Sequence, residues 1–303
     1  MKDILKIARK IYRTSNSREA RRMVVFLVRS VLNKSKMDEI DLFFHSSSLR
    51  EKIAEIYPFV YEQPTRAFFY AGSTINERTE LVFDHFKFME KIFKSNIIID
   101  IYSEKEILLY TKKFDDDELS FILRFYPGLR KEGLISLCLK LNGMDLYQMI
   151  FWIGEDDKSN LSIFIGAMQG PNGENAKDTV KLATKLCHGY RTKNLCVYFT
   201  QVFARAIGIA KIYAVTNAGY YANNHIRLDR KLKTSFSDFW KEVDGKPTDD
   251  LRFFELPLEE TRKTYEEIPT RKRAVYRRRF ELLDDIASNI AKSVLKLKNN
   301  LNG

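Results

Sequence analysis

The chain has 303 residues, of which 45% are apolar and 30% charged, so it can bury a globular core without disulfide bonds or metal ions. This composition excludes a disordered protein. A total of 51 Lys and Arg residues against 40 Asp and Glu residues gives a net charge of +11. This excess favours nucleic acid, phosphorylated cofactors or anionic lipid headgroups as partners, and the solvated surface of a Lys-rich protein is the alternative.

The three cysteines predict neither a disulfide framework nor a zinc site. Cys138, Cys187 and Cys196 are odd in number, lie in apolar runs and lack metal-ligand spacing, so we expect buried thiols and no metal. No run reaches the roughly 20 apolar residues of a membrane span, and charges interrupt the first dozen residues. We therefore expect a soluble cytoplasmic protein, with peripheral contact at the inner membrane as a further hypothesis.

Residues 1–95 are predicted to form a helical subdomain, because their apolar residues recur at spacings of three and four. The polar Ser15-Asn16-Ser17 marks a break and an N-cap. The cations of the first helix would let it lie on anionic lipid, and docking on the core is the alternative. The apolar stripes are Ile4, Ala8, Ile11 and Tyr12, then Val24, Leu27, Val28 and Val31, then Leu81, Phe83, Phe86, Met89 and Phe93.

From residue 96 the pattern changes to β-strands. Short runs rich in β-branched and aromatic residues predict strands over Ile97–Tyr102, Ile107–Tyr110 and Leu119–Tyr126. Two further strands flank Asn142-Gly143, which is typical of a type I′ hairpin turn. Another strand, Leu161–Met168, ends at a loop rich in glycine and proline.

Two helices are predicted next, from Ala176 to Cys187 and from Asn194 to Ile207, with Gly208 as a C-terminal cap. The strand Ile209–Thr216 follows, so a right-handed crossover should make it parallel to the strand before the helices. Beyond His225 we expect irregular chain until a final helix. The predicted fold is α+β or α/β, with a helical subdomain over 1–95, a mixed-sheet domain over 96–303 and a C-terminal helix. That helix should dock through Phe280, Leu283, Ala287, Ile290 and Val294.

The start of the helix near Asn194 is a predicted anion site. Its first turn offers unpaired backbone N–H groups and the positive end of the helix dipole. Arg191 and Lys193 add two cations, and Thr192 adds a hydroxyl. This combination suits a pyrophosphate or a similar phosphorylated small molecule.

The order of hairpin, strand, helix and strand resembles the N-acetyltransferase (GNAT) superfold, in which acyl-CoA lies between two neighbouring strands. The resemblance implies that Ile163–Met168 line the pantetheine and that Arg191–Leu195 hold the phosphates. It implies further polar groups at Asn217 and a leaving-group acid at Tyr220 or Tyr221. The loop from Arg191 to Cys196 contains no glycine, unlike the superfamily's phosphate loop, which leaves a donor other than acyl-CoA open.

A second resemblance extends from about residue 70 onward and rests on many short segments in one order. These segments are Phe164–Gly170, Ala183, His188-Gly189, Arg191–Lys193, Ala206–Gly208, Ala214–Asn217, Phe239-Trp240, Phe253–Leu258, Glu266–Pro269, Lys272-Arg273 and Tyr276–Asp284. Through them the chain resembles the VirK/YbjX family of bacterial proteins. This resemblance implies a link to virulence, to the bacterial envelope and to resistance against cationic antimicrobial peptides, without an established reaction.

Four residues are candidates for proton transfer: His188, Tyr221, Glu174 and His225. Each histidine has an imidazole that can act as a base near neutral pH, and Glu174 could activate an acceptor amine. Capping, packing or solvation are the alternatives for them. His45 and His85 fall in helical segments, where we expect packing roles.

Three functions follow as hypotheses. The first is an acyltransferase with a CoA-type donor acting on an envelope precursor or another amine or hydroxyl acceptor. The second is a tRNA-dependent aminoacyl transferase or an RNA-binding protein, which the cations of Arg271–Arg273 and Arg277–Arg279 would serve. The third is a non-catalytic envelope-stress factor that works through partner proteins or the membrane surface.

Overall fold

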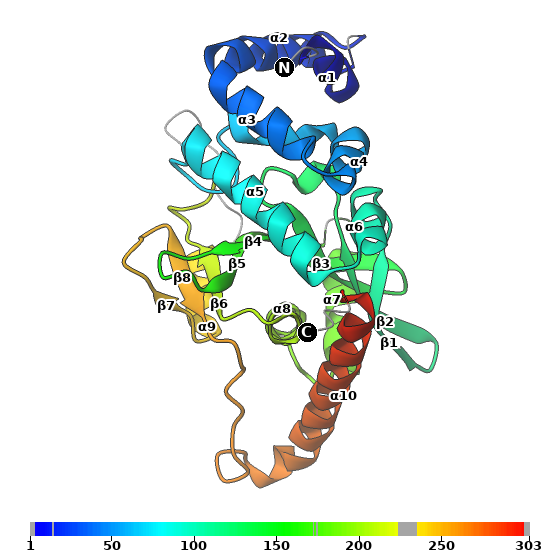
Figure 1. The fold of residues 1–303 in the computed structure, drawn as a ribbon. Coiled ribbons are helices and arrows are strands. Elements are labelled where there is room, and N and C mark those ends of the chain that lie inside the picture. Colours follow the sequence, from blue (N-terminus) through cyan, green and yellow to red (C-terminus); the bar gives the residue numbers. More distant parts are fainter. Residues whose placement is uncertain (1–3, 14, 172, 174, 224–234, 300–303) are drawn as a thin grey trace.

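The computed structural model describes residues 4–13, 15–171, 173, 175–223 and 235–299. It confirms the predicted combination of N-terminal helices, a mixed sheet and a C-terminal helix (Figure 1). Two predicted proton-transfer residues, Glu174 and His225, lie outside the described residues.

Six α-helices come first in the described part of the chain. The first of them docks on the core, which is the alternative to lipid contact given in the sequence analysis. The side chains of Ala8, Ile11 and Tyr12 are buried. Asn16 caps the second helix by accepting a hydrogen bond from the Arg18 backbone N–H at 2.9 Å. The helices are α1 (Ile4–Ile11), α2 (Ser17–Leu32), α3 (Lys34–Phe44), α4 (Ser48–Ile56), α5 (Ile75–Ile92) and α6 (Ser95–Tyr102).

The strand predicted over Ile97–Tyr102 is wrong, because this segment forms α6. Its isoleucines favour a strand by intrinsic preference. The helix instead buries Ile98 and Ile101, which are three residues apart and therefore share one face, together with Tyr102. Contacts with α4 and α5 decide the outcome, and tertiary packing of this kind outweighs local preference.

The sheet has eight strands in the order β1-β2-β3-β4-β5-β6-β8-β7. Neighbouring strands are antiparallel except β5 and β6, which are parallel as the crossover rule predicts. The strands are β1 (Ile107–Phe114), β2 (Asp117–Arg124), β3 (Ile135–Leu141), β4 (Met144–Glu155), β5 (Leu161–Gln169), β6 (Lys211–Val215), β7 (Lys246–Pro247) and β8 (Phe253–Leu256).

The turn between β3 and β4 is the one predicted. Asn142 and Gly143 have φ angles of 51° and 76°, and two positive φ angles are what a type I′ turn requires. Asn142 also accepts a hydrogen bond from the Glu118 backbone N–H at 2.8 Å through its side chain. The turn therefore fixes the register of β3 and β4 and anchors the hairpin to β2.

The segment predicted to be irregular after His225 is partly ordered structure. It contains α9 (Phe236–Glu242), β7 and β8 before the last helix, α10 (Arg273–Leu297). These elements are short, so their sequences carry little periodicity. Trp240 is fully buried and donates a hydrogen bond from its indole N–H to the Val215 carbonyl, which fastens α9 to β6.

Helices cover both faces of the sheet (Figure 1). Phe151 of β4 contacts Phe203 of α8 (Thr192–Ile207), whereas the next residue, Trp152, contacts Phe69 and Tyr70 on the opposite face. Helix α5 packs on β4 from that second face. Helix α7 (Ala176–Leu186) precedes α8, and α10 packs on α8 and β1 mainly through Leu282, Leu283, Ile286, Ile290 and Val294.

His85 links the N-terminal helices to the sheet through a chain of buried hydrogen bonds. Its Nδ1 accepts from the Ile153 backbone N–H at 3.1 Å, so the proton of the neutral ring lies on Nε2. Nε2–H then donates to the Tyr102 hydroxyl at 2.8 Å, and that hydroxyl donates to the Leu134 carbonyl. Burial lowers the pKa of His85 to about 3, which keeps the ring neutral.

Replacing His85 with Gln should lower the free energy of unfolding by about 1–3 kcal/mol, because buried groups lose their partners. In the unfolded chain this histidine protonates below about pH 6.5, whereas in the folded protein it stays neutral. The free energy of unfolding of the wild-type protein should therefore fall by about 1.4 kcal/mol per pH unit below about pH 6.5. That of His85→Gln should not show this decrease. Urea unfolding at about pH 7 and about pH 5.5 measures both, and identical pH dependence in the two proteins would contradict the assignment.

Candidate functional site

The parallel strands β5 and β6 separate part of the way along their length. Their paired residues run from Ser162 with Lys211 to Ile165 with Ala214. Beyond that point β5 continues to Gln169, whereas β6 ends at Val215. The last residues of β5 are therefore paired with β4 on one side, and no described residue forms a ladder with them on the β6 side.

A cavity of about 460 Å³ lies at the end of β5, and we call it the β5-end cavity. Its wall combines three lysines, Lys177 and Lys181 of α7 and Lys193 of α8, with apolar and aromatic side chains. This volume is within the range of small-molecule pockets. The other lining residues are Tyr147, Met168, Gly170, Pro171, Ala176, Val180, Phe236 and Phe239.

The first turn of α8 lies at this cavity and carries no side-chain cap. The helix begins at Thr192, with Arg191 in the N-cap position, and no side-chain hydrogen bond caps it among the described residues. Lys193 extends from this turn into the cavity wall, with its ammonium group 5.5 Å from the centre of the Phe239 ring. Burial lowers the pKa of Lys193, and the nearby Arg191 lowers it further.

Arg191, which was predicted to bind phosphate with Lys193, faces elsewhere. Its guanidinium forms an exposed ion pair with Glu242 at 2.8 Å and does not line the β5-end cavity. Thr192 is buried. The side-chain oxygen of Asn194 is buried without a hydrogen-bond partner in the described part of the chain, and Asn194 is not a lining residue.

Asn217 does not line the cavity but holds in place a helix that does. Its side-chain oxygen accepts hydrogen bonds from the backbone N–H groups of Phe236 and Ser237, and its amide N–H donates to the Ser235 hydroxyl at 2.9 Å. These bonds hold the first turn of α9, which supplies Phe236 and Phe239 to the wall. In this structure Asn217 therefore positions α9.

His188 lies at the end of α7 rather than in the cavity wall. It has a positive φ of 53°, and its carbonyl accepts hydrogen bonds from the guanidinium of Arg279 on α10. Partial burial lowers the pKa of His188, and Arg278, Lys112 and Arg279 lower it further. The ring is therefore neutral near pH 7, in a position that links α7 to the basic start of α10.

A buried carboxylate that the sequence analysis missed lies at the end of β5. Glu132 is 6% exposed and accepts hydrogen bonds from the Tyr220 hydroxyl at 2.6 Å and from the Gln169 side chain at 2.7 Å. Burial raises the pKa of Glu132, and these two donors oppose the rise. The predicted Tyr221 instead packs its ring against Phe68 and Tyr220.

Gly166 is the one signal in the sequence that points to this cluster. A Cβ atom there would lie 1.8 Å from the backbone carbonyl oxygen of Glu132, so only glycine fits. A glycine inside a strand marks such close approach of another backbone. The partner segment, however, could not be identified from the sequence.

Replacing Tyr220 with Phe should lower the free energy of unfolding by about 1–2 kcal/mol at about pH 8. At about pH 5 the decrease should be smaller. The raised pKa of Glu132 means that the folded state holds this proton to a higher pH than the unfolded chain. Loss of the Tyr220 hydroxyl raises that pKa further, so the added cost appears where the carboxylate is charged. Urea unfolding checks this, with the exposed Tyr265→Phe as control, and an equal cost at both pH values would contradict it.

A second recess, of about 640 Å³, is acidic and has an aromatic floor that includes Tyr70, Trp152 and Phe164. Several of its charges are already paired within the protein. Arg252 lies 4.7 Å above the Tyr70 ring and binds Asp250, and the carboxylate of Asp156 accepts hydrogen bonds from Asn160 and Tyr213. Part of the charge of this recess is thus neutralised within the fold.

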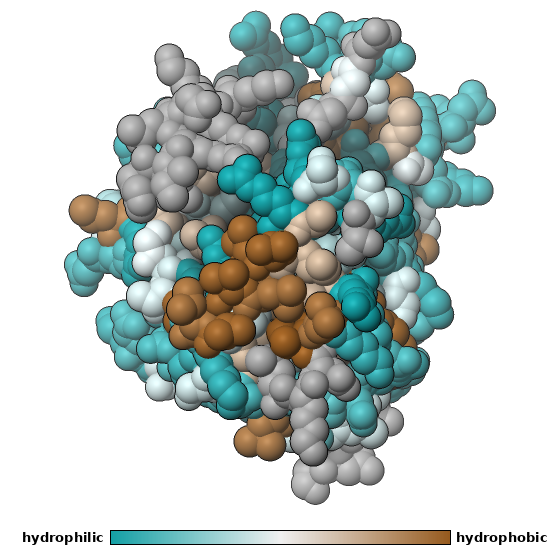
Figure 2. Space-filling view, turned by 90° about the horizontal axis from the view of Figure 1, so that it is seen from above, coloured by the Kyte–Doolittle hydropathy of each residue, from teal (hydrophilic) through white to brown (hydrophobic). Residues whose placement is uncertain are grey.

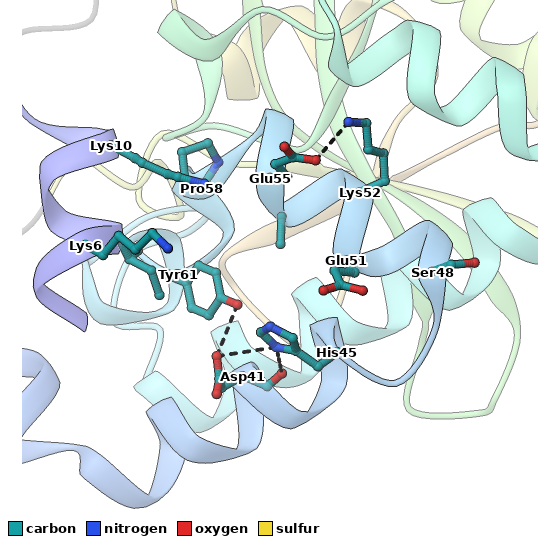
Figure 3. Close-up of a pocket in the computed structure, with 12 residues that line it drawn as sticks. Lys6, Lys10, Asp41, His45, Ser48, Glu51, Lys52, Glu55, Pro58 and Tyr61 are labelled. Atoms are coloured by element: carbon teal, nitrogen blue, oxygen red, sulfur yellow. Dashed lines mark hydrogen bonds and ion pairs between the residues drawn. The ribbon is translucent and has the colours of Figure 1, made fainter. Parts of the chain in front are cut away.

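A third recess, of about 650 Å³, lies among α1, α3 and α4 (Figure 3). The Tyr61 hydroxyl donates to the Asp41 carboxylate at 3.3 Å, and the His45 ring contacts the Asp41 carbonyl at 2.8 Å. Lys52 and Glu55 form an ion pair at 2.8 Å. The lining combines three lysines with three carboxylates, so neither sign of charge predominates in this recess.

The described residues contain neither a helix that could cross a membrane nor a cluster of metal-ligating side chains. None of the helices combines the length and the apolar content that a bilayer crossing requires. Within those same residues, no group of three or more His, Cys, Asp or Glu side chains is placed to hold a metal ion.

Comparisons with known proteins identify relatives without assigning a reaction. The chain is 30% identical over 178 residues to the uncharacterized protein YbjX of Escherichia coli K12, covering 58% of this chain and 53% of that protein. Two uncharacterized proteins of Haemophilus influenzae Rd are 33% identical over 129 residues (43% of this chain, 42% of that protein) and 27% identical over 223 residues (71% and 70%).

The alignments with the first two relatives thus span about half of each protein's length. No solved structure matches the chain. A family described as "Protein of unknown function (DUF535)" matches residues 15–292, which is most of the chain. The protein therefore belongs to this family, which includes the VirK/YbjX relatives that its sequence resembles.

Proposed function

We propose that this protein is an acyltransferase-like enzyme that binds a phosphorylated donor, with acyl-CoA as the first choice, in the β5-end cavity. One observation carries the proposal. Three lysines, the uncapped start of α8 and apolar side chains all lie at one cavity. Phosphates are stabilised by cations and free backbone N–H groups. An acyl or pantetheine chain needs apolar contact, so this wall suits both ends of such a donor.

The wall divides into two chemically different parts. Lys177, Lys181 and Lys193 lie on α7 and on the first turn of α8, where the helix dipole is positive. Met168 of β5 lies in the apolar part, and Phe239 of α9 lies where the two parts meet, because the Lys193 ammonium is 5.5 Å from its ring centre. A donor would therefore bind with its phosphates toward the two helices and its chain toward the end of β5.

The order of the strands supports the same proposal. An antiparallel run ends at β5, two helices lead to the parallel strand β6, and β8 pairs with β6 before the edge strand β7. Ligands of mixed and parallel sheets commonly bind where strands separate at their carboxyl ends. The end of β5 is such a place, and it is where the N-acetyltransferase superfold holds acyl-CoA.

We assign proton transfer in the proposed reaction to Glu132, which lies at the same end of β5 as the cavity and outside its lining. Glu132 is bound to Gln169, and its raised pKa is a property that general acids and bases often show. Tyr220 is its hydrogen-bond partner. Glu174 precedes α7 in the chain and stays a candidate from the sequence.

The proposal also includes an acceptor and a cellular location. We propose an amine or hydroxyl of an envelope precursor as acceptor, because the chain resembles a family linked to envelope integrity and peptide resistance. We propose the cytoplasm as location, because Cys138, Cys187 and Cys196 are all unpaired and buried.

Isothermal titration calorimetry with CoA, acetyl-CoA and a long-chain acyl-CoA tests the donor site. Lys193→Ala should weaken binding at least tenfold, about 1.4 kcal/mol, because the site loses a partly buried cation. Lys177→Ala and Lys181→Ala should each weaken binding less, since both lie nearer to solvent.

Lys292→Ala is the matched control, since Lys292 is an exposed lysine of α10 outside the cavity wall. It removes one positive charge without touching the proposed site. Equal weakening in Lys292→Ala and Lys193→Ala would indicate a non-specific charge effect. Absence of heat with all three CoA species would refute acyl-CoA as the donor.

A further inference from the structure

Helix α2 exposes an aliphatic face that the sequence pattern led us to expect in the core. The side chains of Val24, Val28, Val31 and Leu32 are 55%, 52%, 69% and 77% exposed. The helix instead buries the opposite side, through Phe26 and Ser30. Figure 2, which looks down on the end of the molecule that carries α1 and α2, shows a continuous hydrophobic area there.

The charge carried by α1 and α2 is almost entirely positive. Between Ile4 and Leu32 the sequence has eight Lys and Arg residues and one carboxylate, Glu19. That carboxylate forms an ion pair with Arg22 at 2.5 Å. Arg18 and Arg21 of α2 are exposed. On α1 the exposed cations are Lys6, Arg9 and Lys10, while the apolar side of α1 is buried.

We propose that this face, Val24, Val28, Val31 and Leu32 with Arg18 and Arg21, docks the protein on an anionic bilayer surface. A helix of this kind lies in the plane of the interface with its aliphatic side chains below the headgroups. Cations beside it add electrostatic attraction to an anionic leaflet. The proposal rests on α2 alone and stands independently of the β5-end cavity.

Charge also decides between a bilayer and a second copy of the chain. A two-fold dimer through this face would enclose Arg18 and Arg21 of both copies, four cations in all, within one interface. Such a concentration of like charges opposes association, whereas anionic headgroups neutralise it. The face also lacks the aromatic and methionine residues in which protein interfaces are enriched.

Flotation with vesicles tests the proposal on the full chain. The vesicles contain phosphatidylglycerol with phosphatidylethanolamine, and vesicles of phosphatidylcholine alone serve as the neutral comparison. We expect binding to the anionic vesicles, with at least a tenfold loss of the bound-to-free ratio in the double variant Val28→Ser/Val31→Ser. Arg18→Gln/Arg21→Gln should reduce binding to anionic vesicles and make it less sensitive to salt.

Leu251→Ser/Leu295→Ser is the matched control, because these leucines are 80% and 71% exposed and lie elsewhere in the fold. Thermal unfolding of each variant verifies that the fold is retained, which exposed positions should allow. Binding that is equal in the valine and leucine variants, or equal on neutral and anionic vesicles, would overturn the proposal. So would a dimer in analytical ultracentrifugation that the valine substitutions dissociate while vesicle binding is unchanged.

Discussion

The burial of α8 against the sheet is the interaction on which the rest of the structure depends. From Leu195 to Ala204 every residue of this helix is buried, between strands β3 and β4 and helix α10. A helix that is apolar on all sides has no solvent face and can lie only in the centre of a fold. Its position determines where its first turn meets the end of β5.

Two consequences for the site follow from that constraint. Helix α8 leads into β6, the parallel pairing of β6 with β5 ends at Ile165, and the end of β5 separates from β6 beyond that residue. The helices α7 and α9 then close the sides of the gap and contribute cations and rings to it. The backbone of Glu132 approaches Gly166, and this contact brings a carboxylate to the same end of the strand.

Positive and negative side chains are concentrated in different regions of the molecule, which its net charge does not reveal. Lysines surround the β5-end cavity, acidic residues surround the recess over Trp152 and Phe164, and the helices α1 and α2 are almost purely cationic. Within this pattern the buried ionisable groups are held by specific partners, as His85 is by Tyr102 and Glu132 by Tyr220. A net charge of +11 describes none of these regions individually.

Local signals were sufficient wherever one segment decides its own structure. The turn at Asn142-Gly143, the cap at Asn16, the end of α8 at Gly208 and the central strand β5 were all predictable, because backbone conformation and hydrophobic period act over a few residues. The sequence pattern also singled out Lys193 and Met168, which lie near the ends of α8 and β5 and line the β5-end cavity.

Tertiary structure alone decided the rest. The apolar pattern of α2 predicts a helix, but contacts with α1 and α3 decide which of its faces is buried. As a result Val28 is exposed to solvent. The segment of α6 favours a strand until packing on α4 makes it a helix. Arg191 turns to Glu242, and Glu132 meets Tyr220 across 88 positions of sequence. Such contacts join distant segments, and their energies exceed the local preferences that a sequence pattern expresses.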